Sequence, residues 1–274
     1  MKLRSFGIAL VSAAAFGPPL SLAQQAPPAG AADADALAKQ LSNPVASLVS
    51  VPLQLNYDEG YGAGGDGERW TLNIQPVAPF SISEDWNVIS RTILPIIYQD
   101  GVAGAGSDSG TGDTIQSLFF SPKEPTAGGW IWGVGPAFLL PTASEDVLGT
   151  EQWAIGPTAV VLKQTEDGWT YGALTNYLVS VAGDDDRADV DSLFIQPFLS
   201  KALGQGRTVT LNAESTYDFE GEAWNAPVNL LYSKVTRAGN QMLSYGFGAR
   251  YYFETPAGGP EWGLRFVVTL LYPK

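Results

Sequence analysis

Among the charged residues within strand-like runs of the chain, four have a place on the polar face that needs an explanation. They are Glu214, Arg91, Arg250 and Arg265. The residues around them alternate between polar and apolar types, and alternate residues of a strand point to opposite faces. A ring of charged side chains can select the solutes that pass through a channel. The same side chains could instead form ion pairs that fill a narrow interior, and the sequence leaves both alternatives open.

Uncharged amide side chains fall on the same polar faces and are expected to line the same interior. They are Asn73, Gln75, Gln116, Asn176, Asn212 and Asn229. On a lipid-facing surface an arginine near the midplane would cost about 2–4 kcal/mol. The polar faces are therefore expected to face water or one another.

Enzymatic and cofactor chemistry finds little support in the composition. The chain has no histidine and no cysteine, which removes Ser-His-Asp and Cys-His catalysis and the usual zinc ligands. Its net charge of −13 argues against nucleic-acid binding. We therefore expect a protein that is not an enzyme and that has no catalytic, metal-binding or cofactor-binding residues.

Three further clusters have simpler explanations than a site. The glycine-rich run 62–67 matches G-x-G-x-x-G, but no βαβ pattern follows it, which favours a surface loop over dinucleotide binding. The aspartates of 184–191 could bind Ca²⁺, yet their spacing is not that of an EF-hand, which favours a solvated loop. The carboxylates of 218–222 could act as an acid–base pair, but a solvated outer loop is again favoured.

The elements that must position these residues are long two-faced strands. The run 207–218, RTVTLNAESTYD, sorts by parity into a polar and a more apolar face. A tilted strand that crosses a bilayer needs about 9–11 residues. Similar runs occupy 45–57, 68–80, 86–99, 114–121, 129–141, 152–163, 168–182, 190–201, 206–218, 223–235, 240–253 and 261–272. The pattern predicts an all-β fold, a transmembrane antiparallel up-and-down β-barrel of about twelve strands with a short N-terminal segment.

The N-terminal residues predict export. Basic Lys2 and Arg4, a short apolar stretch over 6–16 and a small-residue cleavage site ending at Ala23 are typical of a signal peptide. We divide the chain into a signal peptide over 1–23, a mobile or short helical segment over 24–44, and an outer-membrane barrel over 45–274. A short helix is expected over 33–41, before Asn43 and Pro44.

The connections and the tryptophans agree with a membrane barrel. If both ends of the barrel lie in the periplasm, the long and acidic connections face outward and the short ones inward. Tryptophans near the strand starts are expected to form interfacial girdles. They are Trp70, Trp86, Trp130, Trp153, Trp169, Trp224 and Trp262.

Prolines are the main objection to this fold, because proline cannot donate a hydrogen bond to a neighbouring strand. Seven interrupt the runs, so several are expected at bulges unless the strand limits are too generous. They are Pro52, Pro76, Pro95, Pro136, Pro157, Pro197 and Pro227.

Several phrases resemble a known family over most of the mature chain. LNIQPVAPFSISEDWNVISRTILPI, GWIWGVGPAFLLPTAS and PEWGLRFVVTLLYPK are similar to an outer-membrane transporter family grouped with the MetA-pathway of phenol degradation proteins, some of which carry the label neuromedin U. The resemblance implies a porin-like, transmembrane channel or transporter of the Gram-negative outer membrane, for small hydrophobic or aromatic compounds. Its expected partners are outer-membrane lipid and lipopolysaccharide, the barrel assembly machinery during biogenesis and a small-molecule solute, with no nucleic acid. A non-conducting structural barrel is the alternative, and an outer-membrane enzyme is a weaker one.

Overall fold

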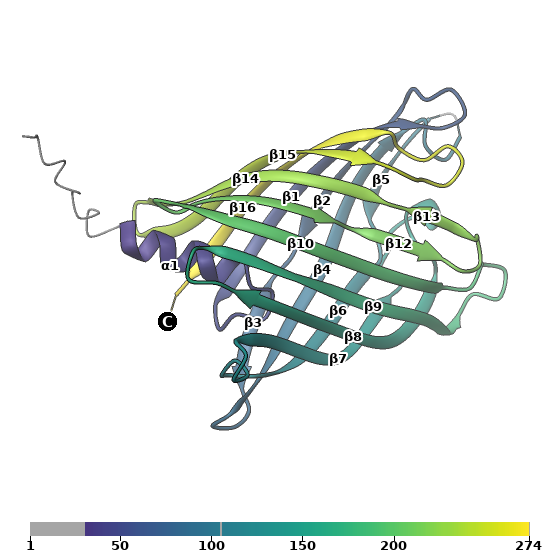
Figure 1. Ribbon diagram of the computed structural model, residues 1–274. Coiled ribbons are helices and arrows are strands. Elements are labelled where there is room, and N and C mark those ends of the chain that lie inside the picture. Colours follow the sequence, from purple (N-terminus) through teal and green to yellow (C-terminus); the bar gives the residue numbers. More distant parts are fainter. Residues whose placement is uncertain (1–30, 105, 274) are drawn as a thin grey trace, which may run out of the picture.

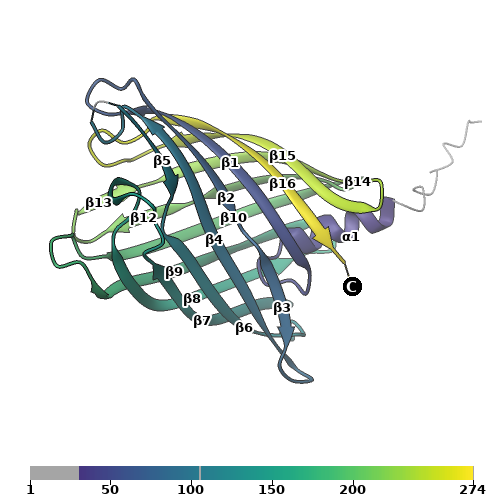
Figure 2. The ribbon, with the colours of Figure 1, turned by 180° about the vertical axis from the view of Figure 1, so that it is seen from behind.

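A computed structural model describes residues 31–104 and 106–273, so the predicted signal peptide lies outside the described residues. Sixteen strand segments form one antiparallel sheet within this part of the chain. Eight of them each run the length of the wall: β1 (Val49–Tyr61), β4 (Trp86–Asp100), β7 (Trp130–Leu140), β8 (Gln152–Gln164), β9 (Trp169–Gly183), β10 (Asp191–Gly204), β15 (Gln241–Tyr252) and β16 (Trp262–Tyr272). Figures 1 and 2 show them wrapped around a common axis.

The remaining eight segments form four interrupted strands, each made of two segments that follow one another in the chain. These are β2 (Gly67–Ile74) with β3 (Val77–Ser81), β5 (Ser107–Thr111) with β6 (Thr114–Pro122), β11 (Arg207–Ala213) with β12 (Ser215–Asp218), and β13 (Ala223–Asn225) with β14 (Pro227–Ala238). Counted this way, the described residues form a closed antiparallel barrel of twelve strands. The predicted fold class is confirmed. Eleven of the twelve predicted runs match the observed strands to within four residues, and the exception, 114–121, omits the segment β5.

The barrel closes because its first and last strands pair. β1 and β16 are antiparallel in continuous register from Val49 opposite Tyr272 to Glu59 opposite Trp262. Closure leaves no strand edge in the membrane, where unpaired backbone groups would have no water to bond. The apolar face of β16 points outward, with Leu264, Phe266 and Val268 each about 40–50% exposed, whereas Arg265 is buried.

Prolines coincide with breaks in the strand pairing. Pro136 lies opposite Pro157 across β7 and β8. The pairing of each strand with its other neighbour is interrupted at the same place. The paired residues skip from Ala137 to Val134 where β7 pairs with β6, and from Ile155 to Thr158 where β8 pairs with β9. Neither proline has an N–H group to donate. Because the two prolines face each other, the wall loses few backbone hydrogen bonds at this position. Pro76 separates β2 from β3, and Pro227 begins β14, so the proline objection is resolved by local interruptions of intact strands.

One end of the barrel carries short turns and also both ends of the described chain. These turns, 82–85, 123–129, 165–168, 205–206 and 239–240, define the short-turn end, and the opposite end is the long-loop end. The helix α1 (Ala31–Leu41) lies across the short-turn end, near the C-terminus (Figures 1 and 2). The sequence predicts a mobile or short helical segment over 24–44. The part of this segment that the structure describes contains the helix α1.

Helix α1 is held by an apolar stripe and by hydrogen bonds from the wall. Ala34, Leu37 and Ala38, spaced to share one face of a helix, are buried against Val235 and Leu271. The Asp35 Oδ1 atom accepts a 2.6 Å hydrogen bond from the backbone N–H of Gly206, and Gln164 Nε2 donates to the Lys39 carbonyl at 2.8 Å. The helix is therefore docked at the short-turn end.

The residues after α1 enter the barrel before β1 begins. Val45 is 5% exposed and packs with Ile89, Phe119, Leu162 and Leu174, which come from four different strands. The Ser47 hydroxyl accepts a hydrogen bond of 3.0 Å from Asn87 Nδ2. This arrangement fills one side of the interior with an apolar core and leaves a space beside it.

Candidate functional site in the barrel interior

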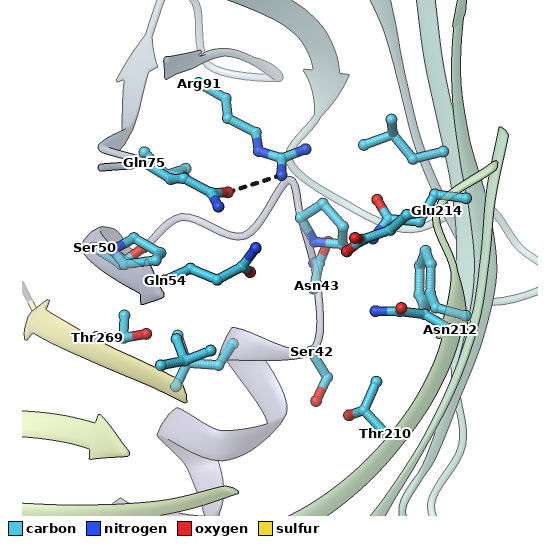
Figure 3. A pocket seen from close by; sticks show the side chains of 18 of the residues that line it. Ser42, Asn43, Ser50, Gln54, Gln75, Arg91, Thr210, Asn212, Glu214 and Thr269 are labelled. Carbon is cyan, nitrogen blue, oxygen red and sulfur yellow. Dashed lines mark hydrogen bonds between the residues drawn. The ribbon is translucent and has the colours of Figure 1, made fainter. Parts of the chain in front are cut away.

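A cavity of about 490 Å³ lies inside the barrel, between the segment 38–48 and the wall. This volume is within the range of small-molecule sites, about 300–1,000 Å³. One wall is polar and comes mainly from β11, β12, β15, β16 and β1, with Thr210, Asn212 and Glu214 among its residues. The rest of the lining comes from β4, β6, β9 and β10, where apolar side chains alternate with polar ones such as Ser117, Asn176 and Gln196. Figure 3 shows the labelled polar side chains around this space.

Glu214 lies at the break between β11 and β12 and forms the strongest polar contact of the cavity. Arg265 donates to both of its carboxylate oxygens, with Nη1–Oε1 and Nη2–Oε2 distances of 2.8 and 2.7 Å. Arg265 Nε also donates to Asn56 Oδ1 at 2.8 Å. The break is stabilised by the Glu214 backbone N–H, which bonds to the Pro227 carbonyl at 3.0 Å. Both charges are thus satisfied by groups of the wall.

Arg91 lines the same cavity but has a different environment. Its Nη2 atom donates to Gln75 Oε1 at 3.1 Å, drawn as a dashed line in Figure 3. None of the ion pairs found among residues 31–104 and 106–273 includes Arg91. Figure 3 shows its guanidinium group extending into the cavity, with Glu214 on the opposite wall. Within the described residues, Arg91 thus has an amide partner and no carboxylate partner.

Arg250 belongs to a separate polar cluster and does not line the cavity. It pairs with Asp58 at 3.1 Å, and the hydroxyl of Tyr252 donates to the same carboxylate at 2.9 Å. Arg69 and Gln99 continue this cluster toward the long-loop end, with an Nη2–Oε1 distance of 2.6 Å. The cluster fills part of the interior beyond the cavity.

Most of the predicted amide positions are interior ones. Asn73, Gln75, Asn176 and Asn212 line the cavity. Asn229 is 2% exposed and lies opposite Asn212 on the same inner face, where it donates to Asn212 Oδ1 at 2.7 Å.

Gln116 lies on the other face of the wall, so its predicted interior position is wrong. Its neighbours Ile115 and Ser117 line the cavity, so Gln116 shares the outward face of Phe120, which is 40% exposed. Its amide group donates to Ser90 Oγ at 3.0 Å and accepts from Thr92 Oγ1 at 2.6 Å. The three polar side chains therefore satisfy one another on the outer surface of β4 and β6.

The apolar part of the cavity lining is what the sequence prediction missed. It includes Ile93, Ile115, Leu174, Phe194 and Phe198. These residues have the parity of interior positions, but the predicted lining consisted of polar side chains alone. The entry of residues 42–48 into the barrel was missed too, because no local pattern specifies where a segment outside the strands will pack.

The predicted girdle tryptophans lie on the outer surface of the wall. Trp70, Trp86, Trp130, Trp153, Trp169 and Trp262 are between 37% and 50% exposed, and Trp224 is partly covered beside Tyr217, with ring centroids 4.9 Å apart. At the short-turn end, the ammonium groups of Lys163 and Lys201 lie near the rings of Trp130 and Trp169. Paired aromatic and basic side chains suit a membrane interface.

The acidic loops contain no arrangement that would hold a metal ion among the described residues. In the loop 184–190, the Asp184 carboxylate accepts from the backbone N–H of Asp186 at 2.8 Å, as in a simple turn. Asp218 accepts from Glu220 N–H at 3.1 Å in the same way. No helix in the part of the chain that the structure covers is long and apolar enough to span a membrane.

The fold is similar to that of several outer-membrane proteins of known structure. An outer membrane channel from Pseudomonas putida F1 matches with a TM-score of 0.63 and 12% identity, over 82% of this chain and 96% of that one. Outer membrane phospholipase A from Escherichia coli matches at 0.48 and 9%, over 82% and 90%. A FadL homologue from Pseudomonas aeruginosa matches at 0.42 and 9%, over 84% and 91%. The first similarity supports the fold, and the other two are too weak to carry an argument.

Comparison with known sequences identifies the family. No curated protein sequence matches the chain. A family model described as "Putative MetA-pathway of phenol degradation" matches residues 62–264. The closed barrel with an apolar exterior is that of a Gram-negative outer-membrane protein. Because the family model spans most of the chain, the protein belongs to the family described as "Putative MetA-pathway of phenol degradation".

Proposed function

We propose that the protein is an outer-membrane channel for small solutes with an apolar or aromatic part. The observation that carries this proposal is the cavity of about 490 Å³ inside the closed wall, lined by side chains from strands around much of the barrel. The structural relative from Pseudomonas putida F1 is described as an outer membrane channel, and the family description refers to phenol degradation. Both agree with passage of a small solute through the interior.

The segment 38–48 forms part of the proposed path. It borders the cavity at the short-turn end, where Ala38, Leu41 and Leu48 face the space. A solute that leaves the cavity toward this end must pass beside the segment or displace it. We therefore place the periplasmic exit at α1 and the entry at the long-loop end, in agreement with the predicted orientation.

The enzyme alternative has little chemical support. The sequence contains neither histidine nor cysteine, and the carboxylates of 218–222 form a turn at the surface rather than a pair across a cleft. A non-conducting structural barrel is the stronger alternative, because an apolar exterior is common to open and plugged barrels. The proposed partners are the lipid and lipopolysaccharide around the wall and the barrel assembly machinery during biogenesis.

Conductance and liposome swelling test the channel function directly. The purified, folded protein is reconstituted into planar bilayers and into liposomes, and swelling is measured with solutes of graded size. We expect discrete conductance steps and faster swelling with small solutes than with large ones. Absence of both, in preparations whose heat-modifiable mobility shows a folded barrel, would favour the non-conducting alternative.

A further inference from the structure

We infer that the cavity binds a small amphipathic acid, with its carboxylate on Arg91 and its apolar body against β6, β9 and β10. This inference rests on the proposed channel function and names its solute class. It starts from a juxtaposition: a guanidinium group with no carboxylate partner among the described residues lies beside apolar residues of the cavity lining, Ile93 and Ile115. The two features together match a molecule with one charged end and one apolar end.

The charges of the cavity favour an anion over a cation. The ionisable residues that line it are Arg91, Arg265 and Glu214. Glu214 already receives two hydrogen bonds from Arg265, so that pair is neutral. Arg91 then leaves a net charge of +1 among the ionisable residues that line the cavity. Guanidinium binds carboxylate with two parallel hydrogen bonds, which makes a carboxylate the best-fitting partner.

Arg91 has donors left for such a partner. A guanidinium group has five N–H donors, and one hydrogen bond, to Gln75, is found among the described residues. Its neighbours on the inner face of β4 are Ile89 and Ile93, and Val77 lies opposite on β3. A charge in this apolar setting gains most from a charged partner.

The body of the ligand has an equally defined place. Ile93 and Ile115 lie beside Arg91 on β4 and β6, and Phe194 and Phe198 lie on β10. The aromatic rings offer flat apolar surface for a ring or a short chain. A ligand that carries only a carboxylate would leave this wall uncovered, and a purely apolar ligand would leave Arg91 unpaired.

The acidic outer loops do not exclude an anionic solute. The aspartates of 184–186 are exposed at the long-loop end. At physiological ionic strength the Debye length is about 8 Å, so exposed charges are screened over a short distance. The enclosed Arg91 is screened less, so its charge dominates inside the cavity.

Three probes separate the two contributions: benzoate has a ring and a charge, benzyl alcohol has the ring alone, and acetate has the charge alone. Binding to the full-length protein in detergent is measured by calorimetry, with empty micelles as the blank. We expect benzoate to bind more tightly than either partial probe. Arg91→Gln should weaken benzoate binding on the order of 10- to 100-fold and leave benzyl alcohol unchanged. Phe194→Ala should weaken benzoate and benzyl alcohol alike and leave acetate unchanged.

Two more variants keep the test clear. Gln75→Glu would place a carboxylate beside Arg91 without removing the arginine, and it should also abolish the preference for benzoate. Arg69→Gln is the matched control, because Arg69 is an interior arginine that does not line the cavity; its benzoate affinity should equal that of the wild type. All variants are first checked for heat-modifiable mobility.

The inference is overturned if the wild type binds benzoate no better than benzyl alcohol, or if Arg91→Gln binds benzoate as the wild type does. Conductance in potassium chloride is recorded on the same preparations. A protein that conducts but shows no preference for benzoate contradicts the ligand class alone. A protein that prefers benzoate but does not conduct contradicts the channel function and leaves the binding site standing.

Discussion

Arg265 on β16 holds Glu214, at the β11–β12 break, through two hydrogen bonds of 2.8 and 2.7 Å across the barrel interior. The side chain of Arg265 is 4% exposed and that of Glu214 is 20% exposed. Removing one partner of a buried pair leaves the other charge without compensation, whereas removing both does not. The pair can therefore be tested for both of the alternatives that the sequence left open, packing and selectivity.

Glu214→Gln is expected to destabilise the barrel and to shift its ion selectivity toward anions. The stability loss should be near 3 kcal/mol, the lower end for a buried pair, because Glu214 is partly exposed to the cavity. The charge of the cavity rises by one, which favours anions. Unfolding in urea measures the first effect, and the reversal potential in a salt gradient measures the second.

The double variant Glu214→Gln with Arg265→Gln is the control for this prediction. It removes both charges, so most of the lost stability should return while the selectivity stays near that of the wild type. If Glu214→Gln alone leaves conductance and selectivity unchanged, Glu214 is not a selectivity element and serves only to pack the interior.

Leu37→Ala is expected to loosen the docking of α1 and to increase conductance. Leu37 is 7% exposed in the cluster with Val235 and Leu271, and truncation of a buried leucine costs about 2–5 kcal/mol. The helix should then leave the short-turn end more often and widen the exit. Single-channel recording gives the conductance, and limited proteolysis reports the release of the helix.

Lys39→Ala is the matched control for the helix, because Lys39 is exposed and lies in the same turn of α1. Its conductance should match that of the wild type. A Leu37→Ala protein in which α1 becomes sensitive to protease while conductance stays the same would show that the path does not pass the helix.

The regular part of this fold could be predicted because a membrane barrel repeats one simple rule. Each strand must be long and two-faced, and Leu211 and Thr208 illustrate the rule within one strand: the first is 45% exposed and the second 5%. The closing pair of β1 and β16 follows from the need to leave no edge in lipid. Alternation is a property of each strand, and closure is a property of the whole barrel. Both can therefore be predicted from the sequence.

The candidate site was less predictable because it depends on contacts between distant segments. Parity placed Glu214 and Arg265 inside, but only the folded barrel brings them together. Among the described residues, Arg250 has a carboxylate partner and Arg91 has none, and this difference depends on Asp58, which is distant from Arg250 in sequence. No pattern in the sequence around Val45 indicates that this residue packs inside the barrel.

Gln116 shows how a strand with two mixed faces can be assigned the wrong way. The inner face of β6 carries Ile115 and Phe119 beside serines, while its outer face carries Gln116 beside Phe120. A shift of one residue in parity exchanges the faces completely. Polarity alone could not decide between them here.

Gln116→Leu tests the corrected position. A leucine on the outer face would meet lipid, at the expense of the hydrogen bonds to Ser90 and Thr92. We expect a change in unfolding free energy within about 1 kcal/mol, since the net worth of a hydrogen bond is about that size, and no change in conductance. Asn176→Leu, an equivalent change on the cavity wall, should alter conductance. A conductance change in Gln116→Leu as large as that in Asn176→Leu would return Gln116 to the interior.

Gly156→Ala is expected to destabilise the wall where the pairing of β8 and β9 is interrupted. A Cβ atom added at Gly156 would lie far inside contact distance of the Tyr177 carbonyl oxygen, a backbone atom that cannot move without shifting β9. Overpacking of this kind costs about 1–3 kcal/mol. The temperature at which the folded band disappears in heat-modifiable mobility should fall.

Gly128→Ala is the control, because the nearest atom to its added Cβ is a side-chain carbon of Trp130 at 3.4 Å. Equal transition temperatures for the two variants would mean that β8 and β9 are less tightly packed at Gly156 than the geometry indicates.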